Sequence, residues 1–378
     1  DGQPYANGEI HIGHALNKTL KDTIVRYKSL KGYWTPFIPG YDTHGMPTEK
    51  KAIQLLGLNR DEIPVNKFRD TCKKFTMDYK DKQTEGFKRL GVLADWDHPY
   101  ITYQPQMEAK QIGVFADMYK KGYIYKGLKP VYWCTDCETA LAEAEIEYKN
   151  VNSNTAYVKF PVKNANGKFD EKNTFVVIWT TTPWTLPGNT GITIGGDFDY
   201  SFVKTGEEVL IMASALVETV MKIAGIEEYE VVNEMKGAEL EGVMCRHPFL
   251  DRDSKVVLGS PETVDVSLDT GTGAVHTAPS YGKEDYLCGL KNGLDIIVCV
   301  DGKGHQTAEA GPFAGMYYAK SDKEIIKYLD EKGLLLASQV VNHSYPHCWR
   351  CKHPIIFRAT SQWFASVDGF RKEALEAI

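Results

Sequence analysis

Two histidines near the start of the chain have the spacing of a phosphate-binding site. His11 and His14 enclose Gly13 between a glycine-containing turn, residues 4–13, and a predicted helix. Imidazole rings at a helix start donate hydrogen bonds to phosphate, and the free N–H groups and the helix dipole favour an anion there. Glycine allows close approach of a backbone or ligand. The alternative is that both histidines only cap the helix or pack.

Further polar residues lie in loops that follow predicted strands. Asp42, in the loop 39–47, could bind a buried ammonium group, or could form an Asx turn. The segment 179–189 ends a strand with hydroxyls that could orient a water and hold a ribose, although threonines also suit a pleated sheet face. Its polar residues are Thr180, Thr181, Thr182, Thr185 and Asn189. His276 and Asp285 follow later, and a lone aspartate near a helix start is typical of an N-cap.

Four of the eight cysteines form two CxxC pairs, Cys134 with Cys137 and Cys348 with Cys351. Four thiolates predict a closed, tetrahedral, structural zinc site, although cobalt or iron would also suit them. One ion can take all four only if the intervening block leaves and returns at neighbouring points, as an inserted domain does. His347 and His353 are alternative ligands, and the other cysteines are expected to be buried thiols, namely Cys72, Cys245, Cys288 and Cys299.

Hydrophobic periodicity predicts an α/β domain with a parallel sheet in the first 150 residues. A helix stripe runs through Leu16, Leu20, Ile24 and Tyr27, and further helices are expected over 66–90 and 106–121. A short strand is expected at 37–38. After residue 150 short β-branched runs predict a β-rich, barrel-like domain with appended helices at 214–223 and 320–332. Its expected strands are 155–160, 174–179, 191–194, 208–212, 273–276 and 296–300.

Composition is that of a globular protein, with 43% hydrophobic and 25% charged residues among 378. No apolar run is long enough to span a membrane and no leader precedes the first motif, so no membrane contact and a cytoplasmic location are predicted. The net charge is −6, with the deficit of basic residues in the part after residue 150. Binding of a nucleic acid would therefore need a local basic patch.

These motifs together resemble class I aminoacyl-tRNA synthetases of the isoleucine type. The resemblance rests on the segments 1–14, 39–47, 179–189, 271–279 and 282–286, and extends to 363–368. It implies a Rossmann-type catalytic half-domain with the first CxxC over residues 1–150. It also implies an inserted editing domain over 151–342, then the second CxxC and a return to the catalytic domain over 343–378.

The resemblance also implies residue roles. His11, Gly13 and His14 would bind the phosphates of ATP, supplied with Mg²⁺, as isoleucyl-adenylate forms. Isoleucine would lie against Pro4, Tyr5 and Tyr41, with its ammonium on Asp42. The chain departs from the family at Gln3 and Tyr41, where relatives usually carry proline and tryptophan.

In the inserted domain the implied reaction is hydrolysis of mischarged tRNA. Thr180, Thr181, Thr182 and Asp285 would carry it, with Asp285 on the ammonium of the amino acid. The pocket that admits valine and excludes isoleucine would comprise Thr180, Thr182, Thr185, Asn189, His276 and Asp285. Such a second site is needed because one methylene provides only about 1–3 kcal/mol of discrimination, a magnitude established on this enzyme type.

We therefore expect a monomeric isoleucine-specific ligase, here without its Lys-Met-Ser-Lys-Ser loop and anticodon-binding domain, whose partners are tRNA, ATP and L-isoleucine. Without that loop the chain alone is not expected to form the adenylate. A stand-alone or valine/leucine-type editing hydrolase is the alternative, and the intact histidine motif and Asp42 argue against it. A non-catalytic, zinc-stapled tRNA-binding module is a third reading, and the threonine segment and Asp285 argue against that.

Overall fold

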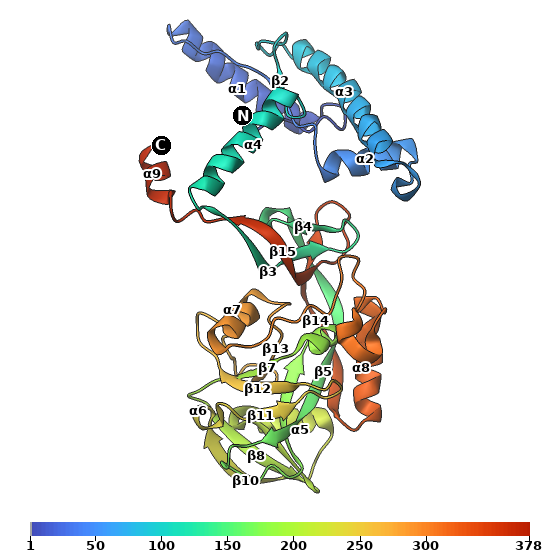
Figure 1. Ribbon diagram of the computed structural model, residues 1–378, viewed down its shortest axis with the longest axis vertical. Coiled ribbons are helices and arrows are strands. Elements are labelled where there is room, and N and C mark those ends of the chain that lie inside the picture. Colours follow the sequence, from blue (N-terminus) through green and yellow to red (C-terminus); the bar gives the residue numbers. More distant parts are fainter. Residues whose placement is uncertain (1) are drawn as a thin grey trace. The chain divides into compact units, whose positions relative to one another are not determined.

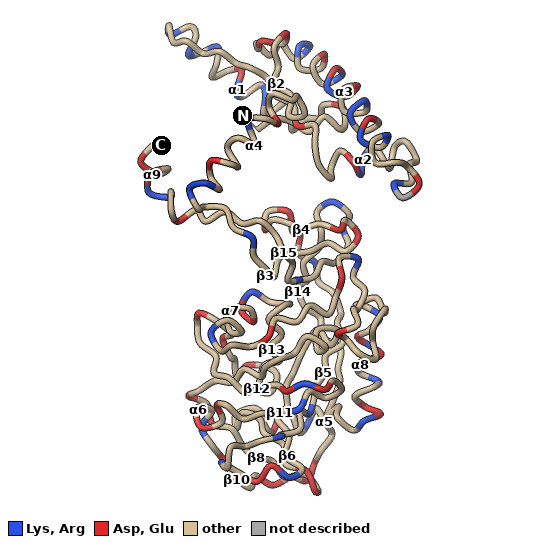
Figure 2. The backbone as a smooth tube through the Cα atoms, viewed as in Figure 1, with Lys and Arg blue, Asp and Glu red and all other residues tan. Residues whose placement is uncertain are grey.

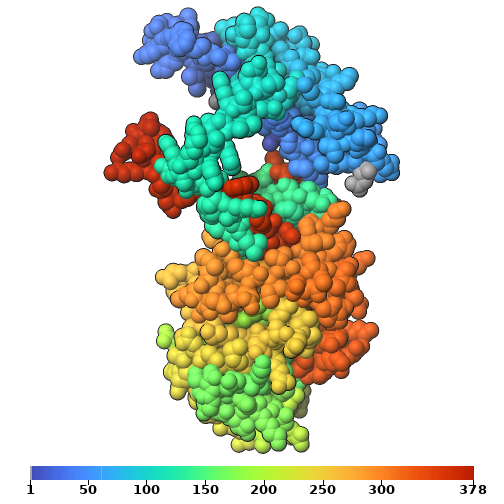
Figure 3. Space-filling model, viewed as in Figure 1, coloured from blue at the N-terminus to red at the C-terminus, as the bar shows by residue number. Residues whose placement is uncertain are grey.

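The chain divides into two compact units in a computed structural model that describes residues 2–378 (Figure 1). Asp1, the first residue of the N-terminal motif, lies outside the described residues, as does the side chain of Asp61. The first unit contains Asp1–Tyr125 and Phe364–Ile378, and the second contains Lys126–Trp363. Within the first unit the C-terminal segment, red in Figure 3, packs on the segment before residue 125, where the rings of Tyr123 and Phe370 lie 5.1 Å apart.

Helices dominate the first unit. They are α1 (Ile12–Leu30), α2 (Met46–Leu56), α3 (Val65–Arg89), α4 (Pro105–Lys120) and α9 (Arg371–Glu376), with a 3-10 turn at Arg60–Glu62. α3 buries Phe68, Phe75 and Phe87, while its outer face mixes acidic and basic residues along its length (Figure 2). The stripe predicted for α1 lies on a helix, but that face is open: Leu16 is 62% exposed and Ile24 61%.

Three chain segments run in parallel beneath these helices. β1 (Gly40–Tyr41) pairs in parallel with β2 (Tyr100–Ile101), and Tyr5 forms a parallel bridge with Asp42. The strand predicted at 37–38 is wrong, since the pairing begins at Gly40. Pro36 and Pro39 flank that dipeptide and lack the N–H groups that a strand ladder needs.

The second unit is built on a mixed sheet. Its strands are β5 (Ile146–Asn164), β6 (Thr174–Thr180), β7 (Gly191–Ile194), β8 (Asp199–Thr205), β9 (Glu208–Ala213), β10 (Glu230–Lys236), β11 (Met244–Arg246), β12 (Asp253–Leu258), β13 (Ala274–Thr277) and β14 (Leu335–Cys348). The order is β10-β8-β9-β6-β13-β7-β12-β11-β5-β14, and an additional β5–β6 pairing closes six of these strands into a ring. β5 passes through residue 150, where the inserted domain was predicted to begin.

Further elements complete the second unit. They are β3 (Ile124–Cys134), β4 (Thr139–Leu141), β15 (Ile356–Ala365), α5 (Val217–Ala224), α6 (Gly237–Leu240), α7 (Lys283–Asn292) and α8 (Tyr318–Glu331), with 3-10 turns η2 (Glu143–Glu145), η3 (Pro183–Gly188), η4 (Ser214–Leu216) and η5 (Ala308–Phe313). β15, β3 and β4 form a small separate sheet. The predicted strand 296–300 is wrong: Cys299 donates its N–H to the Tyr281 hydroxyl at 2.6 Å, and only Val300 makes an isolated bridge.

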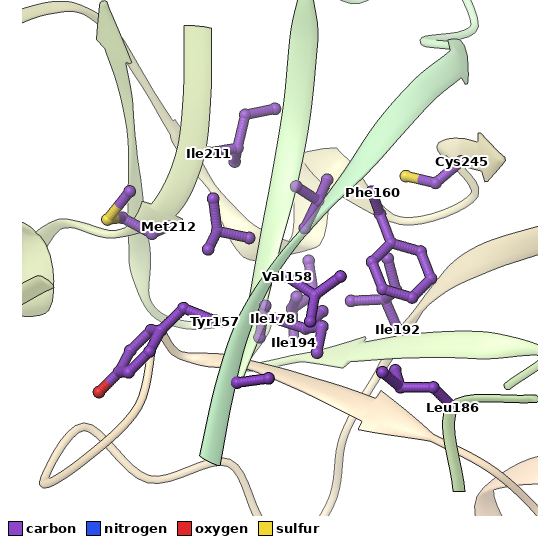
Figure 4. Close-up of a cluster of buried hydrophobic side chains, with 14 of the residues drawn as sticks. Tyr157, Val158, Phe160, Ile178, Leu186, Ile192, Ile194, Ile211, Met212 and Cys245 are labelled. Carbon is purple, nitrogen blue, oxygen red and sulfur yellow. The ribbon is translucent and has the colours of Figure 1, made fainter. Parts of the chain in front are cut away.

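The core of the second unit includes many side chains from the strand ring. Val158, Phe160, Ile178 and Ile192 are each 0% exposed and Ile194 is 1% exposed. Figure 4 shows these side chains gathered from β5, β6 and β7. Burial of β-branched and aromatic side chains on one face of paired strands accounts for the stability of this unit.

Among the described residues, no helix combines the length and the apolar character that crossing a bilayer requires.

Candidate functional site

At the start of α1 the two histidines present their outer nitrogens away from the backbone. His11 is the N-cap, and its Nδ1 accepts the Gly13 N–H at 3.1 Å. The Nδ1 of His14 accepts the His11 N–H at 3.3 Å, and the two rings stack with centroids 3.8 Å apart. Since each Nδ1 accepts, each neutral ring carries its proton on Nε2 as a free donor. Burial, then His11 and Lys18, lower the pKa of His14.

The predicted amino-acid-binding residues lie together on the parallel segments. Asp42 donates its N–H to the Pro4 carbonyl at 2.9 Å, which holds the loop of Tyr5 beside it. The Asp42 carboxylate accepts the His44 N–H at 3.3 Å, an Asx-type contact. Tyr41 is only 1% exposed and its hydroxyl lies 2.6 Å from that of Thr84, so its side chain belongs to the core.

In the second unit a cavity of about 310 Å³ gathers the segments that the sequence singled out. β13 pairs in parallel with β6, with Val275 opposite Trp179, and this register brings both segments to one wall. The cavity is lined by Trp179, Thr180, Thr181, Thr182, Thr185, Asp265, Ser267, Thr270, Gly271, Thr272, Gly273, Ala274, Val275, His276, Ala278, Tyr281 and Asp285. Its size is at the lower end of the range for small-molecule sites.

The threonine hydroxyls are close to one another. Thr182 lies 3.4 Å from both the Thr180 and the Thr185 hydroxyl oxygens, and its N–H donates to the Thr180 hydroxyl at 3.1 Å. The 3-10 turn η3 that carries Thr185 is held from outside by Asp322, whose carboxylate accepts the Trp184 N–H at 2.7 Å. A row of oriented hydroxyls of this kind can hold a water or a sugar hydroxyl.

His276 lies in the same wall with both ring nitrogens occupied. Its Nε2 is 2.9 Å from the Thr185 hydroxyl and its Nδ1 is 2.8 Å from the Asn189 amide nitrogen. Burial lowers the pKa of His276 to about 3, so the ring is neutral near pH 7. Asn189 is 0% exposed and lies behind His276; it is not among the described residues that line the cavity.

Asp285 enters the cavity from the first turn of α7. The N-cap of α7 is Gly282, not Asp285, and a Cβ at Gly282 would lie 2.1 Å from the Asp285 Oδ2, so a larger residue there would displace the carboxylate. Burial, and then Glu284, raise the pKa of Asp285 to about 7, while a hydrogen bond from the Ala278 backbone opposes the rise. A carboxylate with this raised pKa would be stabilised by a cationic ligand group.

The four predicted cysteine ligands converge on one point. The Cys134 and Cys351 sulfurs are 3.5 Å apart, those of Cys137 and Cys348 are 3.8 Å apart, and all four lie within 4.8 Å of one another. A tetrahedral zinc ion with Zn–S bonds of about 2.3 Å requires S···S distances of about 3.8 Å. The donor set therefore fits zinc. His353 instead contacts Asp136, with its Nδ1 2.9 Å from the carboxylate.

Comparison with known proteins identifies the family. The sequence profile described as tRNA synthetases class I (I, L, M and V) matches residues 1–378. The chain belongs to the class I tRNA synthetase family. This confirms the family resemblance on which the predicted roles rest.

Other class I synthetases align along the whole chain. It is 55% identical over 378 residues to a protein of Moorella thermoacetica named isoleucine–tRNA ligase, with 100% of this chain and 40% of that protein covered. A protein of the same name from Caldicellulosiruptor bescii is 55% identical over 383 residues, and the alignment covers 100% of this chain and 41% of that protein. The chain thus spans about 40% of the length of these relatives.

Among solved structures, one titled "The crystal structure of GlLeuRS-CP1" is 15% identical, with a TM-score of 0.39, and covers 50% of this chain and 100% of its own. At this TM-score the likeness does not define the fold.

Several residues around the cavity of this class I synthetase chain were not predicted. Trp179 and Asp265 line the cavity, and Ser254 lies behind it, where its hydroxyl donates to the Asn189 Oδ1 at 2.5 Å. Trp179 directly precedes Thr180 in the sequence, so its position beside the predicted threonines could have identified it as a lining residue. Ser254 is one serine in a strand, and its relation to Asn189 depends on the packing of β12 against β7.

Proposed function

We propose that this chain is the part of an isoleucine–tRNA ligase that holds half of the activation site and an inserted editing domain. The observation that carries the proposal is the 55% identity, over the whole chain, to proteins named isoleucine–tRNA ligase. The full enzyme would join isoleucine to its tRNA in an ATP-dependent reaction, through isoleucyl-adenylate. The inserted domain, proposed over residues 151–342, would hydrolyse valyl-tRNA, with the six-strand ring as its barrel.

The activation step relies on the start of α1. The Nε2–H groups of His11 and His14 would donate to the phosphates of ATP, which is bound with Mg²⁺, beside the positive end of the helix dipole. These donors stabilise the charge that develops as the carboxylate of isoleucine attacks the α-phosphorus and pyrophosphate leaves. Asp42, with Pro4 and Tyr5 beside it, would hold the amino acid by its ammonium group, while the side chain of Tyr41 supports this segment from the core.

The editing step is the hydrolysis of an ester. The oxygen of a water forms a bond to the carbonyl carbon of the amino acid, the bond from that carbon to the ribose oxygen breaks, and a proton passes to the ribose oxygen. Thr180, Thr181 and Thr182 would orient the water and the ribose from the wall of the cavity. Asp285 would bind the ammonium group of the amino acid and so place its carbonyl carbon.

Specificity would come from the size of the same cavity. His276, with Thr185 and Asn189 behind it, forms a rigid part of the wall because both of its ring nitrogens are hydrogen-bonded. A wall that does not yield excludes the additional methylene of isoleucine. Removal of valine in this second site would compensate for the small energetic difference, about 1–3 kcal/mol, on which selection in a first site depends.

Zinc is the proposed occupant of the cysteine cluster. Cys134, Cys137, Cys348 and Cys351 would bind it, and it would supply a structural crosslink with no open position for chemistry. The Cys137 N–H donates to the Cys134 sulfur at 3.3 Å, which favours a thiolate. The ion would join the two chain segments that enter and leave the inserted domain, as a staple at its base.

The proposal is tested by deacylation of valyl-tRNA bearing the isoleucine anticodon. The chain should hydrolyse it, and Asp285→Ala should abolish the hydrolysis while circular dichroism stays unchanged. Asp265→Ala is the matched control, since Asp265 lines the same cavity but is exposed. If both variants lose activity equally, or if Asp285→Ala keeps the wild-type activity, Asp285 is not the ammonium ligand.

A further inference from the structure

A chain of buried hydrogen bonds lies behind the cavity wall and ends on a lining residue. The Ser254 hydroxyl donates to the Asn189 Oδ1 at 2.5 Å, and the Asn189 Nδ2 lies 2.8 Å from the His276 Nδ1. The His276 Nε2 lies 2.9 Å from the Thr185 hydroxyl. Ser254 and Asn189 are each 0% exposed, so bulk solvent does not reach these contacts.

Two carbonyl oxygens, those of Gly191 and Thr182, fix the direction of every hydrogen bond in this series. The Asn189 Nδ2 also lies 2.8 Å from the Gly191 carbonyl oxygen, which can only accept, so the amide nitrogen must face Gly191 and His276. The His276 Nδ1 then accepts, and its Nε2 carries the proton and donates to Thr185. The Thr185 hydroxyl donates in turn to the Thr182 carbonyl oxygen at 2.8 Å.

We propose that Ser254 is a positioning residue of the cavity: it holds the Asn189 amide so that His276 stays the Nε2–H tautomer. The Thr185 hydroxyl then offers the ligand only its one remaining acceptor lone pair. This inference rests on the proposed editing function and deepens it. A ligand group beside Thr185 must be a hydrogen-bond donor, such as a water or a ribose hydroxyl. His276 acts as a fixed wall element and not as a general base.

The surroundings support a ring that stays neutral. The titratable side chains around His276 include His247, which is itself buried with its pKa lowered to about 3. Three more line the same cavity as His276, namely Asp265, Tyr281 and Asp285. The His247 Nε2 lies 2.8 Å from the Leu186 carbonyl, and its Nδ1 accepts the Leu250 N–H at 3.1 Å. An imidazolium at position 276 would turn a second donor toward the Asn189 amide nitrogen, and two facing donors repel.

The tautomer can be measured directly, without any assay of activity. The 378-residue chain labelled with ¹⁵N-histidine is recorded by long-range ¹H–¹⁵N NMR, with His276→Gln to assign the ring. We expect a protonated Nε2, an unprotonated Nδ1 and no titration between about pH 5 and 8, the interval in which an ordinary histidine titrates. A proton on Nδ1, or formation of imidazolium in that interval, would overturn the proposed bond direction.

The role of Ser254 is measured by hydrolysis of valyl-tRNA. Ser254→Ala should lower the rate by roughly tenfold or more, as removal of a partner that orients a functional histidine does. Ser254→Thr keeps a hydroxyl and should retain more of the rate. Ser201→Ala is the matched control, because Ser201 is 3% exposed and its hydroxyl donates to the Ser214 hydroxyl. Ser201 is not among the described residues that line the cavity.

The two proposals fail in different ways. If Ser254→Ala is folded and hydrolyses valyl-tRNA at the wild-type rate, the positioning role is wrong while the editing function stands. If the wild-type chain hydrolyses no valyl-tRNA, the editing function of this chain is wrong, and the NMR result alone decides the tautomer. A Ser201→Ala variant as inactive as Ser254→Ala would likewise overturn a specific role for Ser254.

Discussion

The raised pKa of Asp285 predicts a steep pH dependence of editing. The carboxyl must be ionised to bind an ammonium group, and burial raises its pKa to about 7. With that pKa, the ionised fraction rises about 50-fold between pH 5 and pH 7, whereas an ordinary aspartate changes by less than about 10%. The sign follows from the raised pKa: activity is absent well below it and appears as the pH rises through it.

The assay is kcat/KM for hydrolysis of valyl-tRNA, which reports the pKa values of the free enzyme and substrate. Spontaneous ester hydrolysis is subtracted at each pH. A descending limb is expected near pH 8, where the α-amino group of the substrate loses its proton. Only the ascending limb therefore belongs to Asp285.

Asp285→Asn keeps the shape of the side chain and removes its charge. It should lose about 1.5–3 kcal/mol of binding to the ammonium group, or roughly 10- to 150-fold in kcat/KM, and its ascending limb should vanish. A wild-type profile that is flat from pH 5 to 7, or an Asp285→Asn profile that keeps the limb, would refute this reasoning.

Three other outcomes are expected. Cys348→Ser should lose zinc, measured as metal per chain, and its Tm should fall by about 10 °C. The size of the shift follows because a ligand present at a thousandfold above its Kd stabilises the folded state by about 4 kcal/mol. Cys72→Ser lies outside the cluster and should change neither the zinc content nor the Tm. Phe160→Ala should lower the free energy of unfolding by about 3–5 kcal/mol in urea, because the ring is 0% exposed. Val231→Ala, at a side chain that is 50% exposed, should change it by less than about 0.5 kcal/mol.

Local patterns predicted most elements because the residues that form them are contiguous. The strand expected at 191–194 is β7, and the helix expected at 106–121 is α4 within one residue at each end. The failures have local physical reasons that the pattern hides. Pro36 and Pro39 remove the N–H donors on either side of 37–38, and the backbone at Cys299 bonds to a tyrosine hydroxyl instead of a neighbouring strand.

The candidate site was predictable where its chemistry lies in short motifs. The four cysteines lie within 4.8 Å of one another, and the cavity collects the threonines, His276 and Asp285. What the sequence could not provide is how each group is oriented. Ser254 is brought to Asn189 only by the pairing of β12 with β7, and the side chain of Tyr41 turns into the core because Thr84 on α3 binds its hydroxyl.

In the proposed editing function, this chain removes valine, and not isoleucine, from the isoleucine tRNA. Its most direct test is to follow valyl-tRNA and isoleucyl-tRNA, both bearing the isoleucine anticodon, in parallel reactions with the purified chain. We expect rapid loss of valine while isoleucine is retained. Equal rates for the two amino acids, or no hydrolysis of valyl-tRNA, would contradict it.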